Sequence, residues 1–422
     1  MTSVNITKAV TCLGLRVVSL KLPRLRSAGL RSHNSINWLW VVLFWPGLSV
    51  NAMQTAEVVP VPVAATSPEI NAKAWALMEM NSGWIVSSKN ANTKRSPASI
   101  TKLMANYVLF SELQKGTISL QDRVPISEKA WRAEGSRMFA DVSTKIELEL
   151  LLKGMVIQSG NDASIALAEF VSGSEPSFAA LMNKSARELG LRNSFFVNST
   201  GLTAKNHEMT AVDILTLSAA LIREFPEYYA WYSQKEFKHN GIVQRNRNRL
   251  LWKDSSVDGL KTGYTDAAGY CLVASAKRGE QRWIAVVLGT ESSKAREKAV
   301  LSLLEFGFDN FESTTLLDEQ GGLAALKVYG GNADELRLQV ETPANIVVPS
   351  GRSGDVTRHL EHATFVEAPI SAGAAVGTVR LMLDEREVYS APLLAMSTIK
   401  QAGWWKGLID SVKLRWRKFL DE

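Results

Sequence analysis

Two side chains three residues apart, Ser99 and Lys102, carry the clearest chemical signal in this chain of 422 residues. In a helix this spacing places the hydroxyl and the amine on one face, so that the lysine reaches the serine. A serine hydroxyl at its ordinary pKa is a poor nucleophile, and a neighbouring base is the usual means of activating it. The pair therefore predicts a nucleophilic serine, although the spacing alone is common by chance.

Two further motifs follow at long range, Ser159-Gly160-Asn161 and Lys261-Thr262-Gly263. The three motifs in this order are typical of serine acyl-transfer enzymes that react with penicillin and with the peptides that penicillin mimics. We therefore predict covalent catalysis through an acyl-enzyme on the serine of the first motif.

Helical segments are expected to hold the first two motifs. Pro97 marks the start of a helix that carries Ser99 and Lys102 near its N-terminus, where the helix dipole and free N–H groups favour negative charge. Apolar residues at helical spacing predict a second helix over residues 146–157, and a third is expected over 163–171. The second motif would then lie on the turn between these two helices.

Strand-like segments are expected on either side of the helical region. They cover residues 74–80, 84–87, 270–276 and 283–288. The first two flank Asn81-Ser82-Gly83, which is a hairpin signal, and the last two follow the third motif. Helices from the middle of the region and strands from both ends predict an α/β domain with a mainly antiparallel sheet and a helical cluster.

The composition, 46% hydrophobic and 21% charged, is that of a folded globular protein. Short alternating segments with Gly and Pro turns after the catalytic region predict a small all-β sandwich. The expected division of the chain is a signal peptide over residues 1–52, a flexible leader over 53–68, a catalytic domain over 69–311, an all-β domain over 312–395 and an amphipathic membrane-anchoring helix over 396–422.

The net charge of +6 is concentrated in the first 52 residues, which contain six Lys and Arg and no Asp or Glu. The remainder is about neutral, so a nucleic-acid partner is not expected. A basic stretch, the apolar run 38–44 and the end Val50-Asn51-Ala52 are typical of a secretory signal peptide. The run is shorter than the ~20 residues of a membrane span, and a retained N-terminal anchor is the alternative.

The C-terminal segment shows a second membrane signal. Apolar residues recur on one side at helical spacing: Trp405, Leu408, Ile409, Val412, Trp416, Phe419 and Leu420. The charged residues between them exclude a spanning helix but suit one that lies in the membrane interface. We expect this helix to hold the exported protein on the periplasmic side of the inner membrane. A helix docked on the all-β domain is the alternative.

Cysteine and histidine usage favours neither disulfide nor metal chemistry. Cys12 would be lost with the signal peptide, so Cys271 has no partner, and its apolar neighbours predict a buried strand residue. No cluster has zinc-ligand spacing, and His207 is expected to be solvated in a polar loop. We therefore expect no metal and no organic cofactor.

The chain resembles, over about residues 70–420, the low-molecular-mass penicillin-binding proteins that act as serine-type D-alanyl-D-alanine carboxypeptidases. Further matching stretches are Gly135-Ser136-Arg137-Met138-Phe139, Gln158–Ala163, Leu189-Gly190-Leu191 with Phe196, Asn198, Gly201 and Leu202, and Asp258-Gly259-Leu260. The resemblance implies a catalytic domain like that of β-lactamases and transpeptidases. It also implies that the enzyme removes the terminal D-Ala from peptidoglycan stem pentapeptides and binds β-lactam antibiotics covalently.

The resemblance assigns roles to the first two motifs. Ser99 would attack the carbonyl of the penultimate D-Ala, and Lys102 would be its base, with a pKa lowered by burial and by the charge of Lys261. Ser159 would pass a proton to the nitrogen of the leaving D-Ala. Asn161 would hold a substrate amide and Lys102.

The resemblance also implies a site for the substrate's terminal carboxylate. Lys261 would supply positive charge, and the other residues implied in substrate binding are Thr262, Gly263, Tyr264, Arg247 and Arg296. The backbone N–H groups of Ser99 and Tyr264 would form the oxyanion hole. Some members carry His where this chain has Tyr264, and turnover would differ here if that His tunes deacylation.

Other functions are weighed against this one. A class A β-lactamase needs a Glu that activates the deacylating water, and the nearest candidate, Glu188 with Asn193, has one residue too many for the usual spacing. A D,D-endopeptidase acting on cross-linked peptidoglycan would use the same residues as the carboxypeptidase. A scaffold that binds wall or division proteins through residues 312–395 is a third reading, and the sequence is compatible with a homodimer.

Overall fold

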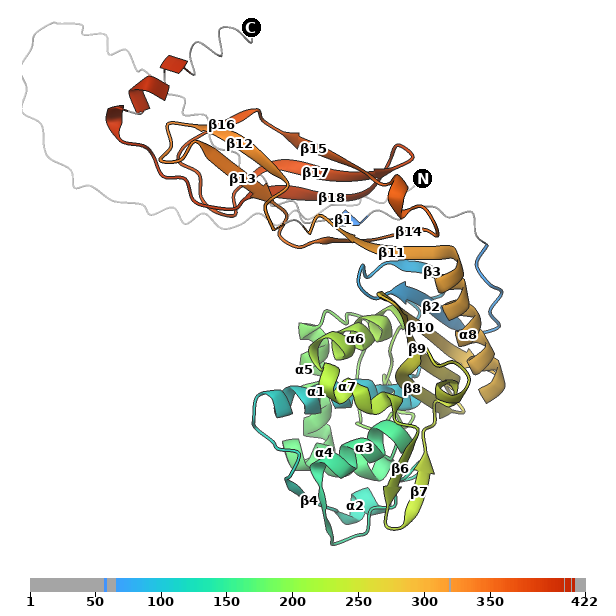
Figure 1. Ribbon diagram of the computed structural model, residues 1–422. Coiled ribbons are helices and arrows are strands. Elements are labelled where there is room, and N and C mark those ends of the chain that lie inside the picture. The colour runs from blue at the N-terminus through green and yellow to red at the C-terminus, as the bar shows by residue number, and fades with distance from the viewer. Residues whose placement is uncertain (1–56, 59–65, 319, 406, 411, 414–422) are drawn as a thin grey trace, which may run out of the picture. The chain divides into compact units, whose positions relative to one another are not determined.

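The computed structural model describes residues 57–58, 66–318, 320–405, 407–410 and 412–413. The predicted signal peptide therefore lies outside the described residues. Figure 1 shows a helical cluster beside a sheet, followed along the chain by a second region built of strands. The predicted fold class, an α/β catalytic domain with an antiparallel sheet and a C-terminal all-β domain, is confirmed.

An antiparallel sheet of five strands, in the order β3-β2-β10-β9-β8, forms the frame of the catalytic region (Figure 1). Its strands are β2 (Ala74–Glu79), β3 (Ile85–Lys89), β8 (Val257–Thr265), β9 (Gly269–Arg278) and β10 (Gln281–Thr290). The predicted hairpin is β2 and β3, and the two predicted downstream strands are β9 and β10. Those predictions are confirmed.

Both faces of this sheet are buried. Successive residues of a strand point to opposite faces, so Ala76 and Val286 contribute to the core shared with the helical cluster, whereas Leu77 and Val287 contribute to a second core. The second core contains residues of α8 (Ser293–Asn310). Burial on both faces explains why these strands read as nearly continuous apolar runs.

The remaining helices of the catalytic region lie between β3 and β8 along the chain. They are α1 (Lys102–Gln114), α2 (Glu128–Trp131), α3 (Leu148–Lys153), α4 (Asn161–Ser172), α5 (Glu175–Glu188), α6 (Ala211–Glu224) and α7 (Pro226–Tyr229). Two short ladders accompany them: β4 (Arg123–Pro125) with β5 (Lys145–Glu147), and β6 (Glu236–His239) with β7 (Ile242–Arg245).

The helix predicted over residues 146–157 is wrong in its bounds. Its first residues belong to β5, because Ile146 is buried opposite Val124 of β4 while the neighbours of Ile146 are exposed. α3 follows, and the last turn, residues 154–158, is a π-helix. Such turns are rare and frequently occur at functional sites, and this one ends at the second motif.

The all-β region has a core of its own, to which Leu338, Leu381 and Leu393 belong. Its strands are β11 (Phe311–Leu316), β12 (Ala324–Tyr329), β13 (Glu335–Gln339), β14 (Ala344–Pro349), β15 (Thr357–His362), β16 (Phe365–Glu367), β17 (Ala375–Leu383) and β18 (Arg386–Ala395). One sheet runs β15-β17-β18-β13-β12-β16, and β11 pairs with β14. In the segment predicted to be a flexible leader, β1 (Glu57–Val58) pairs with β18.

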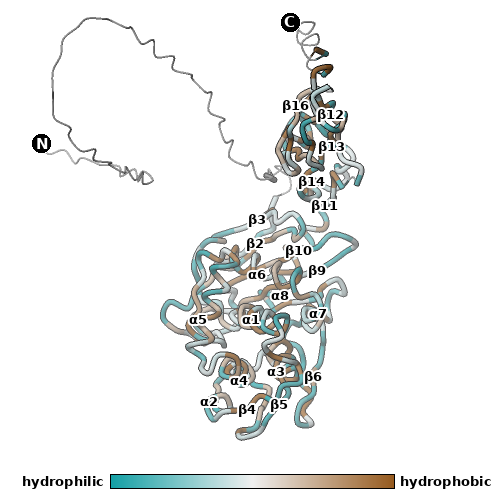
Figure 2. Tube along the Cα trace, turned by 90° about the vertical axis from the view of Figure 1, so that its left-hand side faces the viewer, coloured by the Kyte–Doolittle hydropathy of each residue, from teal (hydrophilic) through white to brown (hydrophobic). Residues whose placement is uncertain are grey.

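The described part of the C-terminal segment is helical at residues 404–405, 407–410 and 412–413, and Figure 2 marks apolar residues there. Its large apolar side chains are all more than half exposed: Trp404, Trp405, Leu408, Ile409 and Val412. Asp410 is buried instead, and its carboxylate accepts a hydrogen bond from the N–H of Gly330 at 3.1 Å. Trp416, Phe419 and Leu420 lie outside the described residues. Within the described residues, no helix has the length and apolar character to cross a membrane.

Candidate active site

Ser99 lies on a tight turn in front of α1. The residues Ala98–Thr101 form a 3-10 turn, and α1 continues directly from Lys102. Gly263 of β8 packs against this turn: a Cβ there would lie 2.9 Å from the carbonyl oxygen of Pro97 and 3.3 Å from the amide nitrogen of Ser99. The absence of a side chain at position 263 therefore lets the edge strand approach the nucleophile.

Lys102 is fully buried and reaches the nucleophile. Its Nζ lies 3.3 Å from Ser99 Oγ, 2.6 Å from Asn161 Oδ1 and 2.7 Å from the carbonyl oxygen of Thr200. Burial lowers the pKa of Lys102 from 10.5 to about 7, although two nearby carboxylates oppose the change. The pKa is lowered in the predicted direction by burial, but the charge of Lys261, the second predicted cause, is not among the contributions to this shift. An amine with this pKa is partly neutral at neutral pH and can accept a proton.

Ser159 places the hydroxyl of the second motif from an unusual backbone position. It caps the π turn with a φ of 66°, in the left-handed region that residues with a side chain rarely adopt. The side chain is 4% exposed, and its Oγ has no hydrogen-bond partner among the described residues. Because a buried hydroxyl without a partner is costly, this atom is available to a substrate group.

Asn161, the first residue of α4, links the first two motifs. Its Oδ1 accepts from Lys102, and its Nδ2 donates to the carbonyl oxygen of Glu134 at 2.6 Å. Its backbone N–H donates to the carbonyl oxygen of Ser136 at 2.7 Å. One amide side chain therefore joins the base to the loop over residues 134–140.

Asp162, which was not among the predicted site residues, binds two backbone N–H groups of the same loop. Its Oδ1 accepts from the N–H of Met138 at 3.0 Å and its Oδ2 from the N–H of Ala140 at 3.1 Å, and the side chain is buried. Hydrogen bonds to an ionised group are stronger than neutral ones. The signal available in the sequence is the position of Asp162 in the first turn of α4, where a carboxylate is stabilised by the helix dipole.

The third motif lies within β8, at the edge of the sheet. Lys261 is 1% exposed, and burial, followed by the charges of Lys102, Arg247 and Arg296, lowers its pKa well below 10.5. Like charges gathered in a region of low solvent access attract an anion.

Two arginines extend this positive region. Arg296 of α8 donates to the carbonyl oxygens of Gly263 at 3.0 Å and Cys271 at 3.2 Å, which fixes it against β8 and β9. Arg247 donates to Ser136 Oγ at 2.9 Å. Neither arginine forms an ion pair with a carboxylate in the described part of the chain, so both can receive one from a ligand.

The site residues surround a cavity of about 440 Å³. The predicted residues that line it are Ser99, Ser159, Asn161, Thr262, Gly263, Tyr264, Arg247 and Arg296. The remaining two, Lys102 and Lys261, are buried next to lining residues. The structure therefore brings all of the predicted site residues together. Eight further lining residues were not predicted as site residues: Gly135, Ser136, Thr200, Gly201, Leu202, Thr265, Tyr270 and Ser293.

Tyr264, which follows the third motif in β8, is half exposed. The hydroxyl donates to Asp266 Oδ1 at 2.9 Å, and the centre of the ring lies 4.3 Å from that of Tyr270. The phenol therefore forms part of the cavity wall and makes no hydrogen bond to the predicted catalytic side chains.

The prediction that His207 is solvated is wrong. Its side chain is 2% exposed, its Nε2 lies 2.8 Å from Thr101 Oγ1, and the N–H of Val197 donates to its Nδ1 at 3.2 Å. Because Nδ1 accepts, Nε2 carries the proton and donates to Thr101. Burial lowers the pKa of His207 to about 4, so the ring is neutral at neutral pH. The polar neighbours of His207 in the chain gave no sign that its loop packs over the nucleophile's turn.

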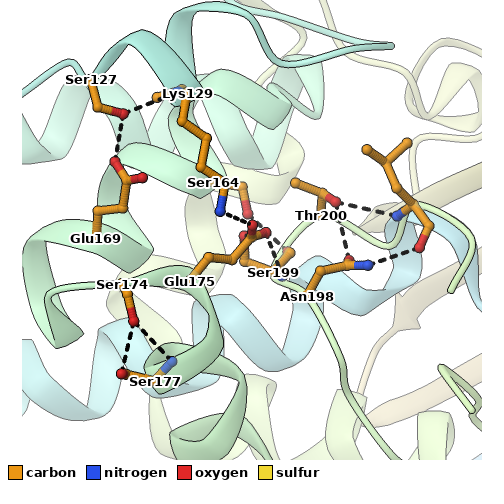
Figure 3. A network of polar contacts seen from close by, with 12 residues as sticks. Ser127, Lys129, Ser164, Glu169, Ser174, Glu175, Ser177, Asn198, Ser199 and Thr200 are labelled. Carbon is orange, nitrogen blue, oxygen red and sulfur yellow. Dashed lines mark hydrogen bonds and ion pairs between the residues drawn. The ribbon is translucent and has the colours of Figure 1, made fainter.

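A polar network holds the turn that contacts Lys102 (Figure 3). Thr200, whose carbonyl accepts from Lys102, donates from Oγ1 to Asn198 Oδ1 at 3.1 Å, and Asn198 Nδ2 donates to the carbonyl of Leu202 at 2.9 Å. The carbonyl of Ser199 accepts from Ser164 of α4 at 2.8 Å. Side chains thus fix this turn on both sides of the carbonyl that binds Lys102.

Glu175, at the start of α5, anchors the same turn (Figure 3). Its Oε1 accepts from both the N–H and the hydroxyl of Ser199, at 3.1 and 2.9 Å, and its Oε2 pairs with Lys129 at 2.8 Å. Burial opposes ionisation, but the bonds from Lys129 and Ser199 lower the pKa of Glu175. An ionised carboxylate therefore supports, at neutral pH, the turn whose carbonyl contacts Lys102.

Cys271 is fully buried in β9, as predicted, and burial raises the pKa of its thiol. Within the described residues, no group of three or more His, Cys, Asp or Glu side chains is arranged to hold a metal ion.

Comparison with protein families finds two matches. A family model described as D-alanyl-D-alanine carboxypeptidase matches residues 61–292, and one described as the C-terminal domain of penicillin-binding protein 5 matches residues 311–401. DacA of Haemophilus influenzae, a D-alanyl-D-alanine carboxypeptidase, is 38% identical over 82% of this chain and 91% of its own length. DacA of Escherichia coli K12 is 37% identical over 82% of this chain and 88% of its own.

Solved structures are also similar to this chain. Penicillin-binding protein 5 from Haemophilus influenzae aligns with a TM-score of 0.77 and 38% identity, over 80% of this chain and 100% of that one. Penicillin-binding protein D2 from Listeria monocytogenes, solved in an ampicillin-bound form, aligns with a TM-score of 0.54 and 28% identity, over 58% of this chain and 100% of that one.

Proposed function

We propose a role for each site residue from the premise that this chain belongs to the D-alanyl-D-alanine carboxypeptidase family. The protein is a serine-type D-Ala-D-Ala carboxypeptidase. The observation that carries the proposed roles is the buried Lys102 amine, which lies 3.3 Å from Ser99 Oγ and has a pKa near 7.

In the first step, neutral Lys102 takes the proton of Ser99 as Oγ attacks the carbonyl carbon of the penultimate D-Ala. The C–N bond to the terminal D-Ala then breaks and leaves an ester on Ser99. Ser159 passes a proton to the departing nitrogen and regains the one that Lys102 took from Ser99, so Lys102 is neutral again. This role is supported by the buried Ser159 hydroxyl, which has no hydrogen-bond partner among the described residues. Backbone N–H groups of Ser99 and Tyr264 stabilise the oxyanion, each contributing about 2.7–4 kcal/mol in comparable sites.

The terminal carboxylate of the substrate binds at the positive end of the cavity. Thr262 offers a hydroxyl, and Arg247 and Arg296 offer guanidinium groups without a carboxylate partner in the described chain. Lys261, buried next to the lining residue Thr262, adds positive charge to this end of the cavity. Water then hydrolyses the ester and restores Ser99. β-lactams acylate the same Ser99, a proposal that the ampicillin-bound relative supports.

A β-lactamase reading has less support. Glu188, the nearest candidate for a water-activating carboxylate, ends α5 and is exposed, with an ion pair to Lys184 at 3.8 Å. It does not line the cavity that contains Ser99.

We further propose that the protein is exported, acts on peptidoglycan stem peptides, and rests on the membrane surface through its C-terminal helix. The exposed Trp404, Trp405 and Leu408 support this placement, because such side chains favour the membrane interface. Asp410 contacts the all-β domain and leaves these apolar groups free.

The test of the mechanism is D-alanine release from a peptide that ends in D-Ala-D-Ala, with the native chain and with Ser99→Ala. Release that disappears in the variant supports the assigned nucleophile. A folded native protein that takes up labelled penicillin at Ser99 but releases no D-alanine would contradict the substrate assignment.

A further inference from the structure

A second and larger cavity adjoins the one that contains Ser99. Its volume is about 750 Å³, within the ~300–1,000 Å³ that small-molecule sites occupy. The two cavities share Arg247, Ser293 and Arg296 in their walls. A ligand whose terminal carboxylate binds these arginines can therefore extend from the first cavity into the second.

A row of arginines forms one wall of the second cavity. Arg245 ends β7, Arg247 lies at a bend and Arg249 starts a 3-10 turn; they alternate in the sequence with buried amides, and all three line the cavity. The amides anchor the segment: Gln244 donates to the carbonyl of Met138 at 2.9 Å, Asn246 to that of Tyr232 at 3.1 Å, and Asn248 to that of Gly259 at 2.9 Å. The positions of the arginines are thus set by the fold.

The charge of this row is only partly compensated. Arg245 pairs with Glu236 at 3.4 Å, but Arg247 and Arg249 form no ion pair in the described part of the chain. Burial and then the charge of Arg249 lower the pKa of Arg247. Arg296 adds a buried Nε that has no partner within the described residues. An anion in this cavity would relieve the repulsion and satisfy these donors.

Apolar side chains form the rest of the wall. Phe139, Ile242, Val243 and Trp252 all line the second cavity, and each is between 44% and 57% exposed. They offer contact to the methylene groups of a long side chain, while the arginine row binds the charge at its end.

We propose that the second cavity is a leaving-group subsite for D-amino acids that carry a further carboxylate on their side chain. The proposal rests on the proposed function, in which Arg247 and Arg296 bind the terminal carboxylate of the leaving residue. From that position the side chain of the leaving residue is the part of the substrate that reaches the arginine row. The enzyme therefore hydrolyses a peptide that ends in D-Ala and an acidic D-residue more efficiently than the same peptide with an uncharged residue of the same shape at its end.

The test compares four peptides that differ only in the last residue: D-Ala, D-Glu, D-Gln and D-Lys. The full chain is assayed for release of that residue. We expect kcat/KM for D-Glu to exceed that for D-Gln by about tenfold, since hydrogen bonds between charged groups are stronger than those to a neutral amide. D-Lys is expected to be the poorest, and the D-Glu preference should fall as salt is raised.

Variants of Arg249, which lines the second cavity but not the first, separate the subsite from the reaction. Arg249→Ala should lower the ratio of D-Glu to D-Gln cleavage several-fold, Arg249→Lys should restore most of it, and Arg249→Glu should favour D-Lys. Arg223→Ala is the matched control, because Arg223 is an exposed arginine outside both cavities. Since Arg249 is exposed, these changes are not expected to unfold the protein.

If wild-type protein releases no D-Ala from the standard peptide, the proposed function fails. If it releases D-Ala but cleaves D-Glu and D-Gln peptides equally, or if Arg249→Glu leaves the order of substrates unchanged, the function stands and the subsite is overturned.

Discussion

The imidazole of His207 donates to the hydroxyl of Thr101 across 2.8 Å, directly between the nucleophile and its base in the chain. Gly201 lies against the same turn, since a Cβ at that position would lie 2.9 Å from Thr101 Oγ1. A neutral ring and the neighbouring backbone therefore both contact the turn that carries Ser99.

Replacement of His207 tests whether this contact positions the turn. His207→Leu leaves the hydroxyl of buried Thr101 without its donor, so we expect a loss of about 1–3 kcal/mol in unfolding free energy and at least a tenfold fall in acylation rate. His207→Gln, which can still donate, should recover part of both. Acylation by labelled penicillin, together with urea unfolding, measures the two effects. Equal acylation in the Leu variant would contradict a positioning role.

Acid stability provides a second prediction for His207. Its pKa is about 4 in the folded protein and about 6.5 unfolded, so the unfolded state binds more protons between these values. Stability should fall as pH decreases from 6.5 to about 4, by on the order of 3 kcal/mol from this group. The His207→Gln variant should lack this component, and unfolding curves at a series of pH values in both proteins measure the difference.

Lys102 should determine how the rate of acylation falls on the acidic side of its pH profile. Only its neutral form accepts the proton of Ser99, and its pKa is about 7, so the second-order rate with penicillin should rise with pH through about 7. Below that value we expect about a tenfold fall per pH unit. A rate independent of pH between about 5 and 9 would contradict the assignment of the base.

Glu175→Gln should shift the pH at which the acylation rate is half-maximal, without abolishing activity. The carboxylate raises the pKa of Lys102, so its neutralisation should shift this midpoint to lower pH, by less than about one unit. The amide oxygen can still accept from Ser199, which keeps the turn in place. Glu147→Gln, an exposed carboxylate on β5, is a suitable control and should leave the midpoint unchanged.

Gly263→Ala tests the close approach of β8 to the nucleophile. A methyl group would lie 2.9 Å from the carbonyl oxygen of Pro97 and 3.1 Å from the Cβ of Ala98, so strand and turn must separate. We expect acylation to fall by two orders of magnitude or more, since displaced reacting groups lose about 10²-fold per ångström. Gly354→Ala, where a Cβ would meet nothing within 4 Å, should leave acylation at the wild-type rate.

The features that were predicted from the sequence depend on local signals. The turn at Asn81-Ser82-Gly83 and the apolar runs of β9 and β10 specify strands wherever they occur, and the three motifs identify side chains by type and order. Their meeting in one cavity follows from the fold that these local elements build.

The features that were missed depend on contacts between distant segments. Asp162 and His207 look like ordinary polar residues until the loop over 134–140 and the turn at Thr101 are packed against them. Likewise, Ile146 fits a helical pattern in the sequence, but it pairs with Val124 and belongs to a strand. Such partners cannot be read from spacing within one segment, because tertiary contacts decide between local alternatives.

The order of strands in the catalytic sheet has a consequence for how the chain acquires its reactivity. Ser99 follows the first hairpin, yet Gly263 reaches it from β8, which is synthesised only after the whole helical cluster. Contacts of such long range form late in folding, because the entropy of closing large loops must first be overcome. A chain whose synthesis has not yet reached β8 therefore carries its serine without a complete site around it. Covalent labelling by penicillin consequently reports the completion of folding as well as the presence of the enzyme.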